Sequence, residues 1–172
     1  MPFHCWQSRE FEITTDLERM DLDTVYGFLF HQSYWAARIP RETFDTSVRN
    51  SLCFGVLHGD RQVGFGRVIS DRATIAYLGD VFVVPGYRGR GLAKWLMECI
   101  LSHPDLQNLR RWILVTQDAH GLYRKYGFSP LARPKNFMEI HDPDAYTSRL
   151  AQRESPLREP FRDGVDRTND PE

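Results

Sequence analysis

Three apolar segments separated by very short polar turns constrain this chain more than any other feature. The segments cover residues 51–57, 62–70 and 74–84. A His-Gly-Asp turn, an Asp-Arg turn and a Pro-Gly pair mark their ends. These turns are too short to hold a crossover helix, so we expect an antiparallel meander. The third segment is apolar at both even and odd positions, which predicts a central strand covered on both sides.

The periodicity on either side of the meander predicts helices. Apolar residues recur at three- and four-residue spacing in the first of them, as on one face of an amphipathic helix. Pro40 suits the first turn of the second helix, and Gly127 suits the end of the last one. The expected helices cover residues 22–30, 40–50, 89–102 and 118–126.

Further short apolar segments extend the sheet. They cover residues 11–14, 111–115, 128–131 and 137–140, and the last two are expected to form a closing pair. The order of elements predicts a mixed α/β fold, with a mostly antiparallel central sheet of about seven strands and helices on both faces. We expect one domain over residues 1–150. Residues 151–172 are polar and contain prolines, which predicts a flexible tail.

The charge balance and the cysteine spacing disfavour nucleic-acid-coating and metal-binding proteins. Lysine and arginine number 22 against 23 acidic residues, which disfavours a protein built mainly to coat nucleic acid. Three scattered cysteines show no metal-ligand spacing, and we expect Cys53 and Cys99 to be small buried apolar side chains. We find no signal peptide and no apolar run of bilayer length, so the expected location is the cytoplasm, without a membrane partner.

A glycine- and arginine-rich segment after the third meander strand carries the clearest functional signal. It reads V-F-V-V-P-G-Y-R-G-R-G-L-A-K. Gly89 and Gly91 let main-chain N–H groups converge, and the first turn of a helix leaves more N–H donors unpaired. Arg88, Arg90 and Lys94 add three cations where the helix dipole is already positive, and a bound polyanion would make that arrangement favourable. The pattern indicates an anion site; the alternative is an ordinary glycine turn whose arginines point to water.

The same segment resembles the coenzyme A signature of the GNAT superfamily of N-acetyltransferases, which reads Q/R-x-x-G-x-G/A. Residues 88–93, R-G-R-G-L-A, match every fixed position. Residues 122–128, L-Y-R-K-Y-G-F, resemble the second signature of the family, and the order of elements over residues 11–140 is similar to the family fold. No G-K-[ST] follows the glycines, so the segment does not resemble a Walker A loop.

This resemblance implies that acetyl-coenzyme A is the acetyl donor and that no metal is needed. It implies that N–H groups of residues 89–94 hold the pyrophosphate. Family members splay two central strands apart at this point, so main-chain groups of the preceding strand would run beside the pantetheine arm. An N–H near Phe82 or Val83 would then polarise the thioester carbonyl. The expected cofactor-binding residues are Val81, Phe82, Val83, Arg88, Gly89, Arg90, Gly91, Leu92, Ala93, Lys94 and Asp118.

One position departs from the family pattern. Many relatives place an asparagine seven residues before the tyrosine of the second signature, where it contacts the cofactor arm. Thr116 stands at that position here, unless a two-residue shortening brings Asp118 into its place. The alternative role for Asp118 is a helix N-cap.

Amine acylation by a thioester needs a proton donor for the leaving thiolate and a proton acceptor for the amine. The resemblance assigns the donor role to Tyr123, because a phenol with a pKa of about 10 stays protonated at neutral pH. Tyr126 is expected to be a packed core residue. The expected base is Asp80, a carboxylate within an apolar strand. The alternatives are an ion pair between Asp80 and Arg67, His120 as the base, and proton loss to a chain of waters.

The acceptor pocket is expected to be built from the two N-terminal helices and the loop that joins them. Its candidate residues are His31, Tyr34, Trp35 and Arg38. The expected function is transfer of an acetyl group to a primary amine of a small molecule or a protein, by a monomer or a homodimer. A non-catalytic acyl-coenzyme A sensor is the main alternative. A nucleic-acid-binding module is a third, disfavoured by the neutral charge; its candidate residues are Arg88, Arg90, Arg110 and Arg111.

Overall fold

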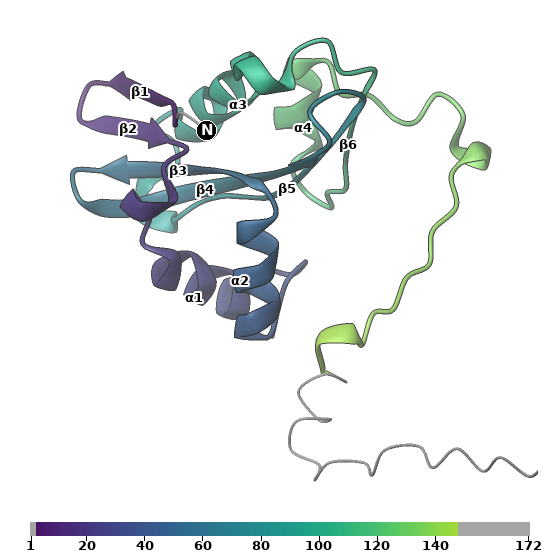
Figure 1. Cartoon of the computed structure of the whole chain (residues 1–172), viewed down its shortest axis with the longest axis horizontal. Helices are drawn as coiled ribbons and strands as arrows, with labels where there is room; N and C mark the ends of the chain where they lie inside the picture. The colour runs from purple at the N-terminus through teal and green to yellow at the C-terminus, as the bar shows by residue number, and fades with distance from the viewer. Residues whose placement is uncertain (1–2, 148–172) are drawn as a thin grey trace, which may run out of the picture.

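The structure is a computed structural model and describes residues 3–147 of the 172 (Figure 1). The tail expected over residues 151–172 lies outside the described residues. Within the described part of the chain, no helix has both the length and the apolar character needed to cross a bilayer.

The centre of the fold is one sheet whose strands follow each other in chain order. The strands are β1 (Cys5–Ser8), β2 (Phe11–Thr14), β3 (Leu52–His58), β4 (Arg61–Ser70), β5 (Ile75–Val83) and β6 (Arg111–Leu114). Each of the first five pairs antiparallel with its neighbour, and β6 pairs parallel with β5. The predicted fold class and the predicted meander are confirmed, with six strands in the described residues against about seven expected.

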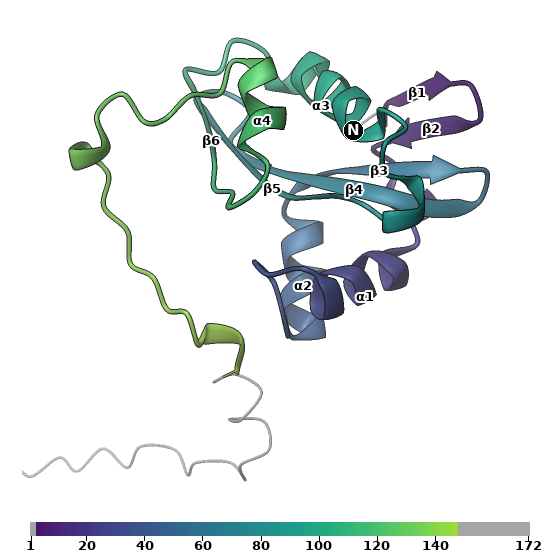
Figure 2. The same ribbon diagram turned by 180° about the vertical axis from the view of Figure 1, so that it is seen from behind.

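Helices cover both faces of this sheet, as the sequence predicts (Figures 1 and 2). The helices are α1 (Leu22–Gln32), α2 (Arg41–Arg49), α3 (Leu92–Ser102) and α4 (His120–Tyr123). The first two lie on one face, and the last two lie on the other. The start of α1 is set by Asp21, whose carboxylate accepts the N–H of Thr24 at 2.9 Å. Helix α3 begins three residues later than predicted, because Gly91 has a φ of 84° and is not helical.

Each face of the sheet has its own apolar core. Leu96, Met97 and Ile100 of α3 are fully buried in the first core. Phe44 of α2 belongs to the second, on the α1/α2 face. Cys53 is buried there, as predicted, and burial raises the pKa of its thiol to about 12. Cys99 is likewise buried in the first core.

A bulge at Asp80 interrupts the alternation of β5. Gly79 pairs with Arg67 and Phe82 pairs with Phe65, so β5 has one residue more than β4 between these pairs. Asp80 takes a φ of 55° there. Side chains that alternate before the bulge therefore exchange faces after it: Leu78 and Val83 share the α3 core, whereas Phe82 belongs to the α1/α2 core.

This bulge corrects the expected faces of the strand. The sequence placed Ile75, Tyr77, Val81 and Val83 on one face, but Val81 and Val83 pack into the α3 core, and the other two do not. The expectation of cover on both sides is also wrong at the start of β5, where Ile75 is 39% exposed and Tyr77 is 38% exposed.

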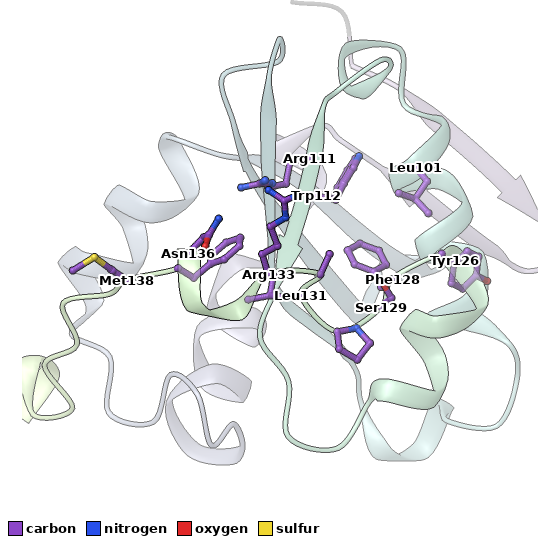
Figure 3. Close-up of a pocket in the computed structure, with 14 residues that line it drawn as sticks. Leu101, Arg111, Trp112, Tyr126, Phe128, Ser129, Leu131, Arg133, Asn136 and Met138 are labelled. Carbon is purple, nitrogen blue, oxygen red and sulfur yellow. The ribbon is translucent and has the colours of Figure 1, made fainter.

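The edges of the sheet also differ from the expectation. Strand β1 was not predicted, because its sequence C-W-Q-S has no apolar alternation and only Trp6 packs against the core. Residues 128–131 and 137–140, expected as a closing pair, are not strands in the described residues. Pro130, within the first of these segments, lacks the N–H donor that a ladder needs. A hollow of about 870 Å³ separates this segment from β6, with Trp112 and Phe128 in its wall (Figure 3).

Candidate active site

The glycine loop joins β5 to α3 through one tight turn. Pro85–Tyr87 form a single turn of 3-10 helix, after which Gly89 and Gly91 adopt φ values of 79° and 84°. A non-glycine residue is strained at such angles. Nothing lies within 4 Å of where a Cβ would stand on either glycine, so the requirement for glycine comes from the backbone and not from crowding.

The start of α3 leaves main-chain donors without a partner in the helix. The N–H groups of Lys94 and Trp95 both donate to the carbonyl of Gly91, at 3.0 and 3.1 Å. The N–H groups of Leu92 and Ala93 precede these first bonds of the helix. No side chain caps this end, and the first turn contains no acidic residue. Because Lys94 uses its N–H within the helix, its contribution to an anion site would come from its exposed ammonium group.

Two arginines of the loop are exposed and partly held in place. The Nε of Arg88 donates to the carbonyl of Val83 at 2.9 Å. The guanidinium of Arg90 lies 5.1 Å from the centre of the Tyr87 ring. Both cations are therefore kept on the same loop as the free N–H donors.

Strands β5 and β6 separate beside this loop. They pair only from Ile75 to Leu78 on β5, and β6 ends at Leu114. The second half of β5 keeps β4 as its neighbour on the other side. The N–H of Val84 donates to Val63 of β4, so the alternation of an antiparallel ladder turns the main chain of Phe82 toward β4 as well.

The same alternation turns the main-chain groups of Val81 and Val83 toward the open side. The bond from Arg88 to the carbonyl of Val83 agrees with this direction. The ring of Phe82, the third strand residue expected beside the cofactor arm, stacks on Phe28 of α1 with 3.8 Å between ring centres.

Asp80 sits in the bulge with both carboxylate oxygens engaged. Oδ2 accepts from Nε of Arg67 at 2.6 Å, and Oδ1 accepts from Nε1 of Trp35 at 3.1 Å. The Asp80 and Arg67 side chains are only 11% and 14% exposed. Arg67 also donates to Oγ of Ser51 at 3.1 Å. The ion pair that the sequence offered as the alternative role for Asp80 is present, and the role of base stays a prediction.

Tyr123 lies on α4 and is near Tyr34 and Asp118. Its side chain is buried, and burial raises the pKa of its phenol to about 12; the nearby Tyr34 hydroxyl and Asp118 carboxylate act in the same direction. The phenol is therefore a neutral donor across the physiological range of pH. Tyr126, three residues later, donates to the carbonyl of Lys94 at 2.8 Å and so ties this segment to α3.

The loop before α4 is held by a contact that the sequence did not indicate. Tyr34, from the α1–α2 connection, accepts the N–H of Gln117 at 2.9 Å and donates to Oδ1 of Asp118 at 3.5 Å. Residues more than 80 positions apart meet here, and no local spacing signals such a contact. Asp118 is not the N-cap of α4: Ala119 takes that position, and its N–H donates to Oγ1 of Thr116 at 3.1 Å.

The remaining candidates divide into two groups. Trp35 donates a hydrogen bond to Asp80, and Tyr34 donates one to Asp118, so both contact residues of the candidate site. His31, Arg38 and His120 are exposed. His31 packs edge-on against its neighbour Phe30 at 4.7 Å. In the described part of the chain, no group of three or more histidine, cysteine or acidic residues is arranged to hold a metal ion.

Comparison with known proteins agrees with this geometry. The family model of the acetyltransferase (GNAT) domain matches residues 49–130. A crystallised Xanthomonas campestris pv. campestris protein, described as belonging to the GNAT family, is 46% identical with a TM-score of 0.79; the match covers 82% of this chain and 99% of that one.

Two curated proteins are also similar. A Gibberella zeae protein named as an acetyltransferase is 28% identical over 142 residues, which is 70% of this chain and 79% of that protein. A histone acetyltransferase from Glycine max is 30% identical over 109 residues, which is 55% of this chain and 46% of that protein. The signatures, the fold and the 46% identity across nearly the whole Xanthomonas protein together establish that this chain belongs to the GNAT family of acetyltransferases.

Proposed function

We propose that this chain transfers an acetyl group from acetyl-coenzyme A to a primary amine. The observation that carries the proposal is that a candidate anion site and an opening in the sheet adjoin each other. The start of α3 offers free N–H donors and cations, and the opening between β5 and β6 leads away from it along Val81 and Val83. Residues 1–150 are proposed as the acetyltransferase domain, acting in the cytoplasm as a monomer or a homodimer.

The residues present fit a long ligand that has a diphosphate and an amide-bearing arm. The N–H groups of Leu92 and Ala93, with the side chains of Arg88, Arg90 and Lys94, would meet the phosphates. The main-chain N–H groups of Val81 and Val83 would pair with carbonyl groups of the arm, one of them the thioester carbonyl, whereas the carbonyl of Val83 already accepts from Arg88. When bound, the thioester supplies an activated acetyl group.

The proton steps fall to side chains at the end of the opening. The amine loses a proton, its nitrogen bonds to the acetyl carbon as the carbon–sulfur bond breaks, and the thiolate takes a proton. Tyr123 is proposed as the donor to sulfur, because its raised pKa keeps it protonated. Asp80 is proposed to accept the proton of the amine through a water, although its carboxylate already accepts from Arg67 and Trp35.

Two measurements test this function. Calorimetry with coenzyme A at low salt measures binding, and release of free thiol from acetyl-coenzyme A measures transfer across a panel of primary amines. The panel includes a histone-tail peptide, because the Glycine max relative is named for that substrate. Arg88→Ala is expected to weaken binding. Binding without thiol release on any amine would favour the non-catalytic sensor, and absence of binding would contradict both functions.

A further inference from the structure

Three large apolar side chains are exposed side by side on the α1/α2 face of the sheet. Ile69 of β4 is 46% exposed, and Ile75 and Tyr77 of β5 are 39% and 38% exposed. Ile69 and Tyr77 are direct cross-strand partners, and Ile75 precedes Tyr77 by two residues on the same face. We call these three residues the open face. Contiguous exposed apolar side chains of this kind mark binding surfaces more often than isolated ones do.

The open face adjoins the proposed site of transfer. The ring of Tyr77 lies under Gly79, where an added Cβ would stand 3.4 Å from it, and Asp80 follows directly. Burial raises the pKa of Tyr77, and the Asp80 carboxylate raises it further, so its hydroxyl stays uncharged. The open face therefore continues into the bulge where β5 and β6 separate.

Two more aromatic rings lie beside the bulge and the loop before α4. Trp35 is 40% exposed, yet Asp80 holds its indole N–H. Tyr34 is 46% exposed, yet its hydroxyl is fixed because it accepts a hydrogen bond from the N–H of Gln117. The two rings pack edge to face at 4.9 Å. Rings held in this way need little further ordering when a ligand arrives, which favours binding.

The charges around these rings suit a cation. Asp118 is exposed, and its carboxylate lies 3.5 Å from the Tyr34 hydroxyl. The other carboxylate, Asp80, is already paired with Arg67. An ammonium group at this place would meet one available carboxylate and the faces of two aromatic rings.

We propose that the acceptor is a small primary amine carried on an aryl or branched-alkyl body. Its amine lies between Asp118, Tyr34 and Trp35, and its apolar body lies against Tyr77 and the cross-strand partner Ile69, with Ile75 beyond them. This assignment of substrate class rests on the proposed acetyl transfer, and the reaction is the one described above.

The test compares two primary amines that differ only in the body: 2-phenylethylamine and ethylamine. We expect kcat/KM to be at least about tenfold higher for 2-phenylethylamine, and Tyr77→Ser and Ile69→Ser each to lower that ratio severalfold, the scale of a few methylene contacts. Asp118→Asn is expected to lower kcat/KM for both amines by a similar factor. Phe3→Ser is the matched control and should leave the ratio unchanged. Phe3 is 63% exposed and lies two residues before β1, at the edge of the sheet opposite β6.

Binding is measured separately from activity. Calorimetry of 2-phenylethylamine with the coenzyme A-loaded protein should show binding in the wild type and in Phe3→Ser, and weaker binding in Tyr77→Ser, with unchanged melting temperatures confirming that the variants fold. If acetyl-coenzyme A binds but no amine releases thiol, the proposed acetyl transfer fails. The calorimetry of 2-phenylethylamine would still show whether the amine binds at the open face. Equal kcat/KM for the two amines, a preference for spermidine or for a histone-tail peptide, or a ratio unaffected by Tyr77→Ser would each overturn the inference.

Discussion

Replacing Gly91 by alanine should separate the conformation of the glycine loop from its contacts. Gly91 has a φ of 84°, and no atom lies within 4 Å of the added Cβ, so the cost comes from the backbone alone. An L-residue in the left-handed region costs about 1–2 kcal/mol. Alanine also stabilises by about 0.4–1 kcal/mol, because it restricts the unfolded chain. The expected net loss of unfolding free energy is therefore about 1 kcal/mol.

Gly86→Ala is the matched control within the same loop. Gly86 also has open space at its Cβ position, and it is not among the glycines with positive φ. Only the unfolded-chain effect applies to it, so this variant should be neutral or slightly stabilised. The two variants should then differ by about 1–2 kcal/mol, or about 2–8 °C in Tm for a chain of this size.

Urea unfolding and calorimetry with coenzyme A together measure the outcome. If the loop keeps its shape, Gly91→Ala loses stability and retains affinity. If the loop relaxes to relieve the strain, stability is recovered and affinity for coenzyme A falls instead, since Leu92 and Ala93 no longer present their N–H groups in the same direction. Equal melting temperatures together with equal affinities for the two variants would refute the reasoning.

Three further outcomes are expected. Tyr123→Phe should lower kcat by about 10²-fold or more while affinity for coenzyme A is unchanged, as steady-state kinetics and calorimetry would measure; an unaltered kcat would remove the proton-donor role. Arg67→Met should lower the unfolding free energy by about 3–5 kcal/mol, because it leaves the carboxylate of Asp80 buried without its partner. Urea unfolding should show that adding Asp80→Asn restores much of this loss. A double variant no more stable than Arg67→Met would contradict the ion-pair explanation. Burial lowers the pKa of His103 below its ordinary value of 6.5, so the folded state binds fewer protons than the unfolded state as the pH falls. Neutral His103 therefore adds to the unfolding free energy above pH 6.5, and this contribution is lost as the pH falls below that value. Urea midpoints from about pH 7 to about pH 5 should fall more steeply in the wild type than in His103→Asn, which retains an acceptor for the N–H of Asp105; parallel slopes would exclude His103 as the source.

The parts of the fold that were predictable depend on local chemistry. The meander follows from apolar segments joined by turns too short for any other connection, and β3, β4 and β5 lie within a residue or two of the expected limits. The glycine loop follows from the need for positive φ at Gly89 and Gly91, which few other residues meet. Pro130 already argued against a strand over residues 128–131, because proline has no N–H to donate to a ladder.

The parts that were not predictable depend on contacts between distant segments. The bulge at Asp80 adds one residue to β5, and a bulge is defined by register against a partner strand, which periodicity along one strand does not contain. The bond from Tyr34 to Gln117 and the bond from Trp35 to Asp80 join the α1–α2 connection to the opening of the sheet.

The sequence alone was enough to predict the class of fold and the place of the glycine loop, because both depend on residue types at short spacing. The anion site on that loop and the proton-donor role of Tyr123 stay predictions. Only the tertiary structure decided which main-chain groups of β5 face the opening, that Asp80 is paired with Arg67, and that Ile69, Ile75 and Tyr77 share an uncovered face. These properties depend on strand register and on which surface each helix covers, and both are set when the whole chain packs together.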